Sequence, residues 1–118
     1  MKKILLIDDD PDIIAVTSYI LEDANFHVFT STTAEEGQMR LKYEKPDLIL
    51  LDVFLPKMQG WELSKQLKSD DNYKHIPIIF FTADSSFVTK SAEEIGGNDF
   101  IIKPYEEDEL LAIVKKYI

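Results

Sequence analysis

The chain has 118 residues, enough for one domain with a small core of its own. Its 22 acidic and 13 basic residues give a net charge of −9, which argues against nucleic-acid binding because that affinity depends largely on Lys and Arg neutralising phosphates. Cysteine is absent, and no apolar run approaches the roughly 20 residues that span a membrane. We therefore expect a cytoplasmic domain without disulfides, thiol chemistry, or direct contact with membrane or nucleic acid.

Short aliphatic runs alternate with amphipathic segments along the whole chain. The aliphatic runs indicate strands that are buried on both faces, at 3–7, 27–30, 47–52, 76–82 and 99–102. The amphipathic segments predict helices over about 11–24, 33–43, 61–68, 86–95 and 106–118. A strand followed by a helix, repeated five times, predicts a parallel α/β sheet with right-handed crossovers and helices on both faces.

Capping signals mark where several of these helices begin and end. Asp10-Pro11 is typical of a helix N-cap followed by proline in the first turn. Thr32 or Thr33 is suited to cap the second helix, and Lys45-Pro46 is expected to end it. Asn25 is the expected stop of the first helix.

Polar side chains stand at the carboxyl ends of four of the strands. Asp8 and Asp9 follow the first strand, and Asp52 ends the third. Thr82 ends the fourth strand, and Lys103 follows the fifth. In a five-stranded parallel sheet of order 2-1-3-4-5, the strand order reverses between the first and third strands, and ligands bind there. That order would bring Asp8 and Asp9 together with Asp52.

Three neighbouring carboxylates repel one another unless a proton or a cation compensates them. Mg²⁺ is the better candidate, because it prefers oxygen ligands from carboxylates, waters and phosphoryl groups. A carboxylate such as Asp52 can also accept a phosphoryl group as an acyl phosphate. The Lys103 ammonium could then pair with the phosphoryl oxygens or with Asp52, and the Thr82 hydroxyl could donate a hydrogen bond to a phosphoryl oxygen.

With these motifs the sequence resembles the receiver domain of two-component response regulators. The resemblance covers essentially the whole chain, and its motifs occur in the family's order and spacing. They are Ile4-Leu-Leu-Ile-Asp-Asp-Asp-Pro11, Asp47-Leu-Ile-Leu-Leu-Asp52, Leu55-Pro56-Lys-Met58-Gln-Gly60, Phe81-Thr82-Ala83 and Asp99-Phe100-Ile-Ile-Lys103-Pro104.

The resemblance implies a flavodoxin-like fold with five helices, and phosphorylation of Asp52 by a histidine kinase or a phosphotransfer protein. It implies Mg²⁺ bound by Asp8, Asp9, Asp52 and the backbone carbonyl of Phe54. Thr82 and Lys103 would bind the phosphoryl group.

Switching in the family involves the hydroxyl matched by Thr82 and an aromatic residue matched by Phe100, which turns inward. The affected face comprises the fourth helix, fifth strand and fifth helix, where an output partner or dimer mate binds. Such a domain is a signalling switch that assists its own phosphorylation and slow dephosphorylation, not a turnover enzyme. The family suggests a cis bond before Pro104, and the sequence by itself leaves both isomers open.

Four positions near the motifs bear on how closely the chain follows the family. Gln59 stands where an acidic residue is common, and Phe100 lacks the hydroxyl of the common tyrosine. Phe54, at a variable position, and Asp84 flank the expected path of the water that would hydrolyse an acyl phosphate. We expect Phe54 to exclude water and slow this hydrolysis.

Other classes of function are weaker alternatives. A degenerate receiver would bind partners without phosphorylation, but Asp52, Thr82, Lys103 and the acidic pair are all present. Phosphatases resembling the haloacid dehalogenase group carry a second acid two residues after the nucleophile, where this chain has Phe54. No strand is followed by a glycine-rich phosphate loop of a nucleotide-binding protein. Because the sequence stops after the last helix, we expect a stand-alone regulator or a piece of a longer protein.

Overall fold

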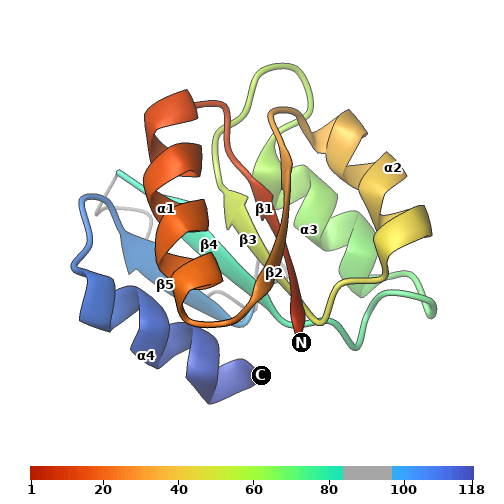
Figure 1. The fold of residues 1–118 in the computed structure, drawn as a ribbon. Helices are drawn as coiled ribbons and strands as arrows, with labels where there is room; N and C mark the ends of the chain where they lie inside the picture. The colour runs from red at the N-terminus through yellow and green to blue at the C-terminus, as the bar shows by residue number, and fades with distance from the viewer. Residues whose placement is uncertain (84–96) are drawn as a thin grey trace.

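The computed structural model describes residues 1–83 and 97–118, which form a five-stranded parallel sheet with helices on both faces (Figure 1). The strands are β1 (Lys3–Ile7), β2 (His27–Ser31), β3 (Leu48–Asp52), β4 (Ile78–Thr82) and β5 (Asp99–Ile102). The helices are α1 (Pro11–Asp23), α2 (Ala34–Glu44), α3 (Gly60–Lys68) and α4 (Glu107–Tyr117).

The strand order is β2-β1-β3-β4-β5, so the flavodoxin-like order expected from the sequence is confirmed. β1 lies between β2 and β3, and Leu6 pairs with Thr30 on one side and with Leu50 on the other. Because all neighbouring pairs are parallel, the carboxyl ends of β1, β3, β4 and β5 meet at one edge of the sheet. The polar residues that follow those strands therefore gather at that edge.

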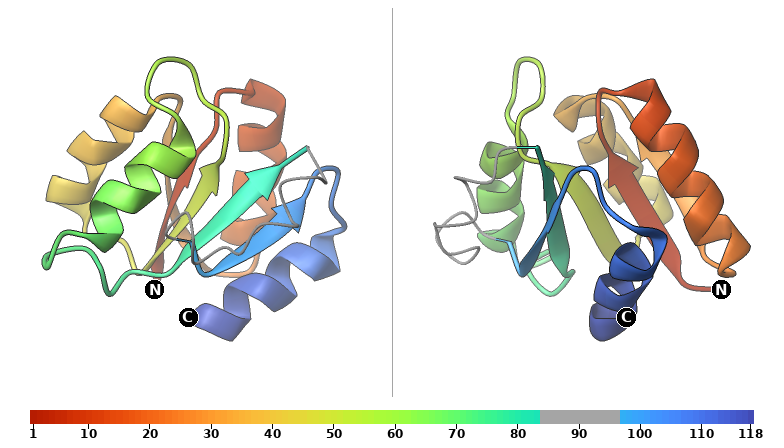
Figure 2. Two further views of the ribbon diagram at one scale, coloured as in Figure 1. Left: turned by 180° about the vertical axis from the view of Figure 1, so that it is seen from behind. Right: turned by 90° about the vertical axis from the view of Figure 1, so that its left-hand side faces the viewer.

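Two described helices cover each face of the sheet, with α1 and α4 on one side and α2 and α3 on the other (Figures 1 and 2). Neighbouring residues of β1 serve opposite faces. Ile4 and Leu6 pack in the cluster that includes residues of α1 and α4, whereas Leu5 and Ile7 pack with residues of α2 and α3. A strand covered on both sides needs an uninterrupted apolar sequence, which is why β1, β3 and β4 lack alternation.

The expected capping residues occupy the helix ends. The Asp10 side chain accepts a hydrogen bond from the Asp12 amide at 2.9 Å, and Thr33 accepts one from the Glu36 amide at 3.1 Å. These bonds satisfy amides that have no partner within the first turn of a helix. At the other ends, Asn25 and Lys45 adopt positive φ angles of 71° and 48°, which turn the chain out of α1 and α2.

Some expected elements differ from the structure. The described residues contain four helices instead of five, and the helix expected over 86–95 lies outside them. The fourth strand begins at Ile78, not at Ile76, because the Ile76 amide donates to the Tyr73 carbonyl and closes a turn. Pro77 then has no amide hydrogen to offer to the sheet. No described helix combines the length and the apolar character that a membrane span would need.

Candidate functional site

Three carboxylates meet at the edge of the sheet where β1 and β3 end. Oxygens of Asp8, Asp9 and Asp52 all lie within 4.8 Å of one another, so the convergence expected from the sequence is present. Asp8 is fully buried, Asp52 is nearly so, and Asp9 is exposed. The acidic cluster is therefore enclosed at Asp8 and Asp52 and open at Asp9.

Backbone amides hold one oxygen of each buried carboxylate. The Asp10 amide donates to Asp8 Oδ1 at 2.9 Å, and the Phe54 amide donates to Asp52 Oδ1 at 3.2 Å. Both donors lie two residues after the carboxylate that they bind, at the turn by which the chain leaves its strand. The second oxygen of each carboxylate, Oδ2, faces the ammonium of Lys103.

Lys103 bridges the two buried carboxylates. Its Nζ lies 2.7 Å from Asp8 Oδ2 and 3.4 Å from Asp52 Oδ2. Burial alone would lower the pKa of Lys103, but the hydrogen bond to Asp8 and the charges of Asp52 and Asp8 outweigh it and raise the pKa. The ammonium therefore stays charged. The sequence led us to expect the contact with Asp52, whereas the shorter contact with Asp8 was not foreseen.

Asp52 is harder to ionise than an ordinary aspartate. Burial, and then the neighbouring charge of Asp8, raise its pKa from 3.8 to about 6, although Lys103 and the Phe54 amide act in the opposite direction. A cation bound between the carboxylates would favour the ionised form.

Thr82 and Phe100 lie on the two strands beyond Asp52. Thr82 is buried at the end of β4, and its carbonyl accepts a hydrogen bond from the Lys103 amide at 2.8 Å. This bond extends the pairing of β4 with β5 by one residue and fixes where Lys103 leaves the sheet. Phe100 is half-buried, with its ring centroid 5.9 Å from that of Phe80. Asp84, the other residue expected near the site, lies outside the described residues.

The loop between β3 and α3 is held by internal hydrogen bonds that the sequence did not reveal. The Leu55 amide donates to Gln59 Oε1 at 3.2 Å, and the Gly60 amide donates to the Val53 carbonyl at 2.9 Å. A Cβ at Gly60 would lie 1.8 Å from the Asp52 carbonyl oxygen, so a larger residue would displace the loop or the strand end. Phe54, at the start of this loop, has a side chain that is 48% exposed.

A second unforeseen contact involves Tyr105, two residues after Lys103. The Tyr105 hydroxyl forms a hydrogen bond with Thr17 Oγ1, which is buried in α1, and the Tyr105 ring stacks on Phe81 with centroids 5.5 Å apart. Burial raises the pKa of Tyr105. The peptide bond between Lys103 and Pro104 is cis. Thr17 and Tyr105 are far apart in the sequence, so no local pattern could have linked them.

The acidic cluster suits a hard cation better than a soft one. Among the described residues, the possible metal ligands that converge here are all carboxylates, which offer oxygen ligands, and none is a histidine or a thiolate. Oxygen ligands with one open side fit Mg²⁺, which keeps several waters when it binds. The residues present therefore fit the metal that the sequence led us to expect.

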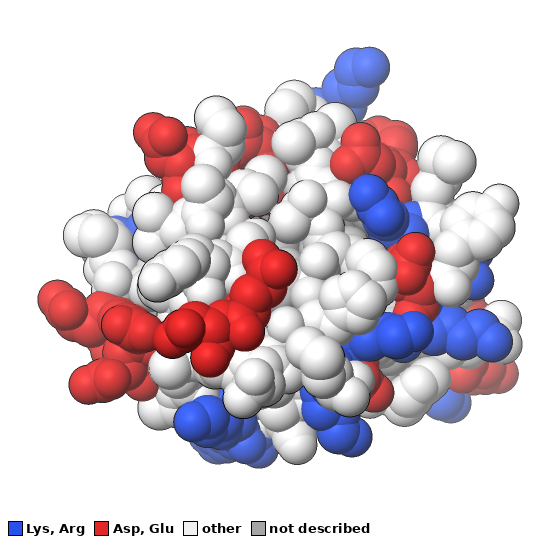
Figure 3. Space-filling view, viewed as in Figure 1, with Lys and Arg blue, Asp and Glu red and all other residues white. Residues whose placement is uncertain are grey.

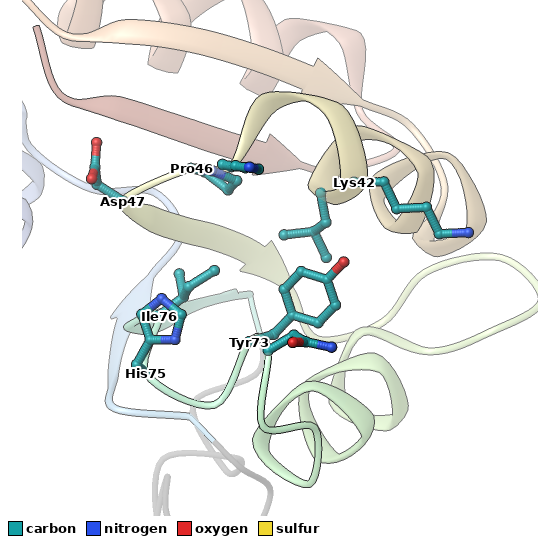
Figure 4. A pocket seen from close by; sticks show the side chains of 9 residues that line it. Lys42, Pro46, Asp47, Tyr73, His75 and Ile76 are labelled. Carbon is teal, nitrogen blue, oxygen red and sulfur yellow. The ribbon is translucent and has the colours of Figure 1, made fainter.

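A cavity of about 410 Å³ lies at the opposite end of β3 and is separate from this cluster (Figure 4). Its lining includes Pro46 and Asp47, which precede β3, together with Tyr73, His75 and Ile76. The acidic cluster stands at the other end of the same strand, at Asp52. The cavity therefore plays no part in the chemistry of the acidic cluster.

Comparison with known proteins decides the family. The sequence profile described as "Response regulator receiver domain" matches residues 4–115. The chain belongs to this receiver-domain family. It is 40% identical over 115 residues to the alkaline phosphatase synthesis transcriptional regulatory protein PhoP of Bacillus subtilis, covering 97% of this chain and 47% of that protein. The receiver domain thus spans about half the length of this curated relative.

Other relatives of this receiver domain differ in architecture. It is 33% identical over 119 residues to the CAI-1 autoinducer sensor kinase/phosphatase CqsS of Vibrio cholerae, covering 99% of this chain and 17% of that protein. Chemotaxis response regulator CheY4 of Vibrio cholerae superposes with a TM-score of 0.92 at 28% identity, with 100% of this chain and 99% of that chain covered.

A receiver domain crystallised with magnesium also matches. It comes from a sensor histidine kinase of Pseudomonas aeruginosa, with a TM-score of 0.89 and 25% identity, and the match covers 98% of this chain and 96% of that chain. Its magnesium ion is coordinated in the active site cleft. The recognition made from sequence motifs is confirmed.

Proposed function

We propose that Asp52 accepts a phosphoryl group from a histidine kinase or a phosphotransfer protein, with Mg²⁺ bound beside it. The observation that carries this proposal is the position of Asp52 within 4.8 Å of the carboxylate oxygens of Asp8 and Asp9, with the Lys103 ammonium 3.4 Å from Asp52 Oδ2. A carboxylate nucleophile, oxygen ligands for a cation and a fixed ammonium are the groups that phosphoryl transfer to aspartate requires.

Asp8, Asp9 and Asp52 would hold Mg²⁺ together with the backbone carbonyl of Phe54. Bound there, the ion would neutralise part of the charge on the transferring phosphoryl oxygens. The open side of the cluster at Asp9 leaves room for the waters that Mg²⁺ retains.

In the reaction, an Asp52 carboxylate oxygen attacks the phosphorus atom of the donor. The bond between phosphorus and the donor atom, a histidine nitrogen in the kinase, breaks, and its electron pair leaves with that nitrogen. Lys103 offsets negative charge on the transferred group, and the Thr82 hydroxyl donates a hydrogen bond to one phosphoryl oxygen. The product is an acyl phosphate on Asp52.

We infer that the acyl phosphate switches a surface and that the domain is a signalling switch, not a turnover enzyme. Thr82 would move toward the phosphoryl oxygen, and Phe100 would turn further into the core. Phe100 lies on β5 and already packs against the buried cluster that contains Phe80, so inward rotation replaces one apolar contact by others. The altered face would include β5 and α4, with residues 86–95 outside the described part of the chain.

The surface charge bears on the kind of partner. Figure 3 shows acidic side chains across the left and centre of the face that carries α1, with Lys and Arg toward the lower edge and the right. With a net charge of −9, the domain would attract partners with basic patches and repel nucleic acid. We therefore propose protein partners, a kinase for input and an output partner or dimer mate at β5 and α4.

Incubation with acetyl phosphate, in Mg²⁺ and in EDTA, tests this function. Phosphate-affinity electrophoresis should show a slower band for the wild type in Mg²⁺ alone and none for Asp52→Asn. A wild type that forms no adduct in Mg²⁺, while it still binds the ion, would favour the degenerate receiver that acts without phosphorylation.

A further inference from the structure

We infer that Gln59 is a positioning residue for the metal site and that it acts through the peptide bond between Phe54 and Leu55. This inference rests on the proposed function, because it concerns the Phe54 carbonyl as a ligand of Mg²⁺. Gln59 itself contacts none of the three carboxylates among the hydrogen bonds of the described residues. Its effect would pass through the backbone.

The peptide unit is planar, so its two polar groups cannot be oriented independently. The Phe54 carbonyl and the Leu55 amide belong to the same trans unit, and they point in opposite directions across it. Gln59 Oε1 accepts a hydrogen bond from that Leu55 amide at 3.2 Å. Fixing the amide hydrogen on the loop side therefore fixes the direction of the Phe54 carbonyl oxygen.

The chain is also held on both sides of this peptide unit. The Phe54 amide is bound to Asp52 Oδ1 at 3.2 Å, so the chain is held immediately before the peptide unit. The Leu55 side chain is buried at 3% exposure, which anchors the chain immediately after it. With the chain held on both sides, the hydrogen bond from the Leu55 amide to Gln59 Oε1 further restricts rotation of the peptide plane between them.

Gln59 is in turn held by the start of α3. The backbone amide of Gln59 donates to Glu62 Oε1 at 3.1 Å, and the neighbouring Gly60 amide donates to the Val53 carbonyl at 2.9 Å. An amide side chain accepts the Leu55 hydrogen without placing another negative charge beside the acidic cluster. This gives the neutral residue at position 59, where the family commonly has an acid, a physical role of its own.

The test measures binding of Mn²⁺, a paramagnetic substitute for Mg²⁺, by the electron paramagnetic resonance signal of the free ion. Gln59→Met keeps the length of the side chain but loses the oxygen acceptor, and it should bind Mn²⁺ about tenfold more weakly than the wild type. Gln59→Glu keeps an oxygen acceptor at the same length and should bind Mn²⁺ at least as tightly as the wild type.

Glu62→Ala is the matched control. It loosens the start of α3 by removing the acceptor of the Gln59 amide, yet it leaves the Leu55 amide with its partner, so Mn²⁺ affinity should stay within about twofold of the wild type. Thermal unfolding in EDTA checks that each variant is folded. If Gln59→Met binds Mn²⁺ as tightly as the wild type, the positioning role of Gln59 is refuted and the proposed function stands. If the wild type binds Mn²⁺ no more tightly than Asp9→Ala does, the proposed metal site is refuted, and the positioning role of Gln59 is refuted with it.

Discussion

Lys103 Nζ lies closer to Asp8, at 2.7 Å, than to Asp52, at 3.4 Å. The residue proposed to receive the phosphoryl group is therefore not the nearer partner of the lysine. Lys103 instead neutralises a fully buried carboxylate that would bind the cation. The ammonium and a bound cation would thus share the carboxylates of Asp8 and Asp52, and each should weaken the binding of the other.

Removing the Lys103 charge should strengthen cation binding. We expect Lys103→Met to bind Mg²⁺ about threefold to tenfold more tightly than the wild type, because a positive charge next to the ligands is lost. Isothermal titration calorimetry measures this affinity. Lys116→Met removes the same charge from an exposed site beside Asp99 and serves as the control. An unchanged or weaker affinity in Lys103→Met would show that the ammonium does not compete with the ion.

The raised pKa of Asp52 predicts how stability depends on pH. Its folded pKa of about 6 lies above the ordinary value of 3.8, so the folded state holds the proton more tightly than the unfolded state. The contribution of Asp52 to stability is therefore fully present below about pH 4. This contribution, at most about 3 kcal/mol, is lost as the pH rises through about 6. In EDTA at pH 8, Asp52→Asn should raise the free energy of unfolding.

Urea unfolding at several pH values checks this prediction. The advantage of Asp52→Asn should shrink toward pH 4 and also shrink in saturating Mg²⁺, which stabilises the ionised wild type. Asp9→Asn removes an exposed carboxylate of the same cluster and should have a smaller effect in EDTA. An Asp52→Asn variant that is less stable than the wild type at pH 8 in EDTA would contradict the account.

Phe54 should control the lifetime of the acyl phosphate. Its side chain is 48% exposed two residues after Asp52, where it can restrict the approach of water. We expect Phe54→Asn to lose the phosphoryl group on the order of tenfold faster, which corresponds to about 1.4 kcal/mol in activation free energy. Quenched samples analysed by phosphate-affinity electrophoresis give the rate. Phe54→Leu keeps apolar bulk and should stay near the wild type, and an unchanged rate in Phe54→Asn would refute the role.

The contact between Thr17 and Tyr105 should contribute to stability. Thr17→Val and Tyr105→Phe each remove one hydroxyl and leave the other in a buried or half-buried place, so each should cost about 1–2 kcal/mol. The double variant should cost much less than the sum of the two, because no hydroxyl is left without its partner. Chemical denaturation of the four proteins forms the cycle, and additive costs would mean that the two hydroxyls do not interact.

The sequence predicted most strongly what depends on local patterns. The aliphatic runs predicted β1, β3 and β4 because both faces of those strands are covered, and Asp10-Pro11 predicted the start of α1 because the cap lies within one turn. Asp8, Asp9 and Asp52 were brought together by sheet order, and the position of each at a strand end was readable in advance.

What could not be predicted depends on side chains that meet across the fold or around a loop. The preference of Lys103 for Asp8 over Asp52 follows from where β5 ends relative to β1 and β3, which no spacing in the chain encodes. The bond from Leu55 to Gln59 requires the particular path of the loop after β3. The start of β4 was placed two residues early because Ile76 is as apolar as the strand, although its amide closes a turn.

Borohydride trapping tests most directly whether Asp52 itself carries the phosphoryl group. Reduction of an acyl phosphate converts the aspartate into homoserine, which peptide mass spectrometry locates in the sequence. After incubation with acetyl phosphate and Mg²⁺, homoserine should be found at position 52 and be absent when EDTA replaces Mg²⁺. Homoserine at Asp8 or Asp9, or unmodified Asp52 in protein shown to bind Mg²⁺, would contradict the proposed role of Asp52.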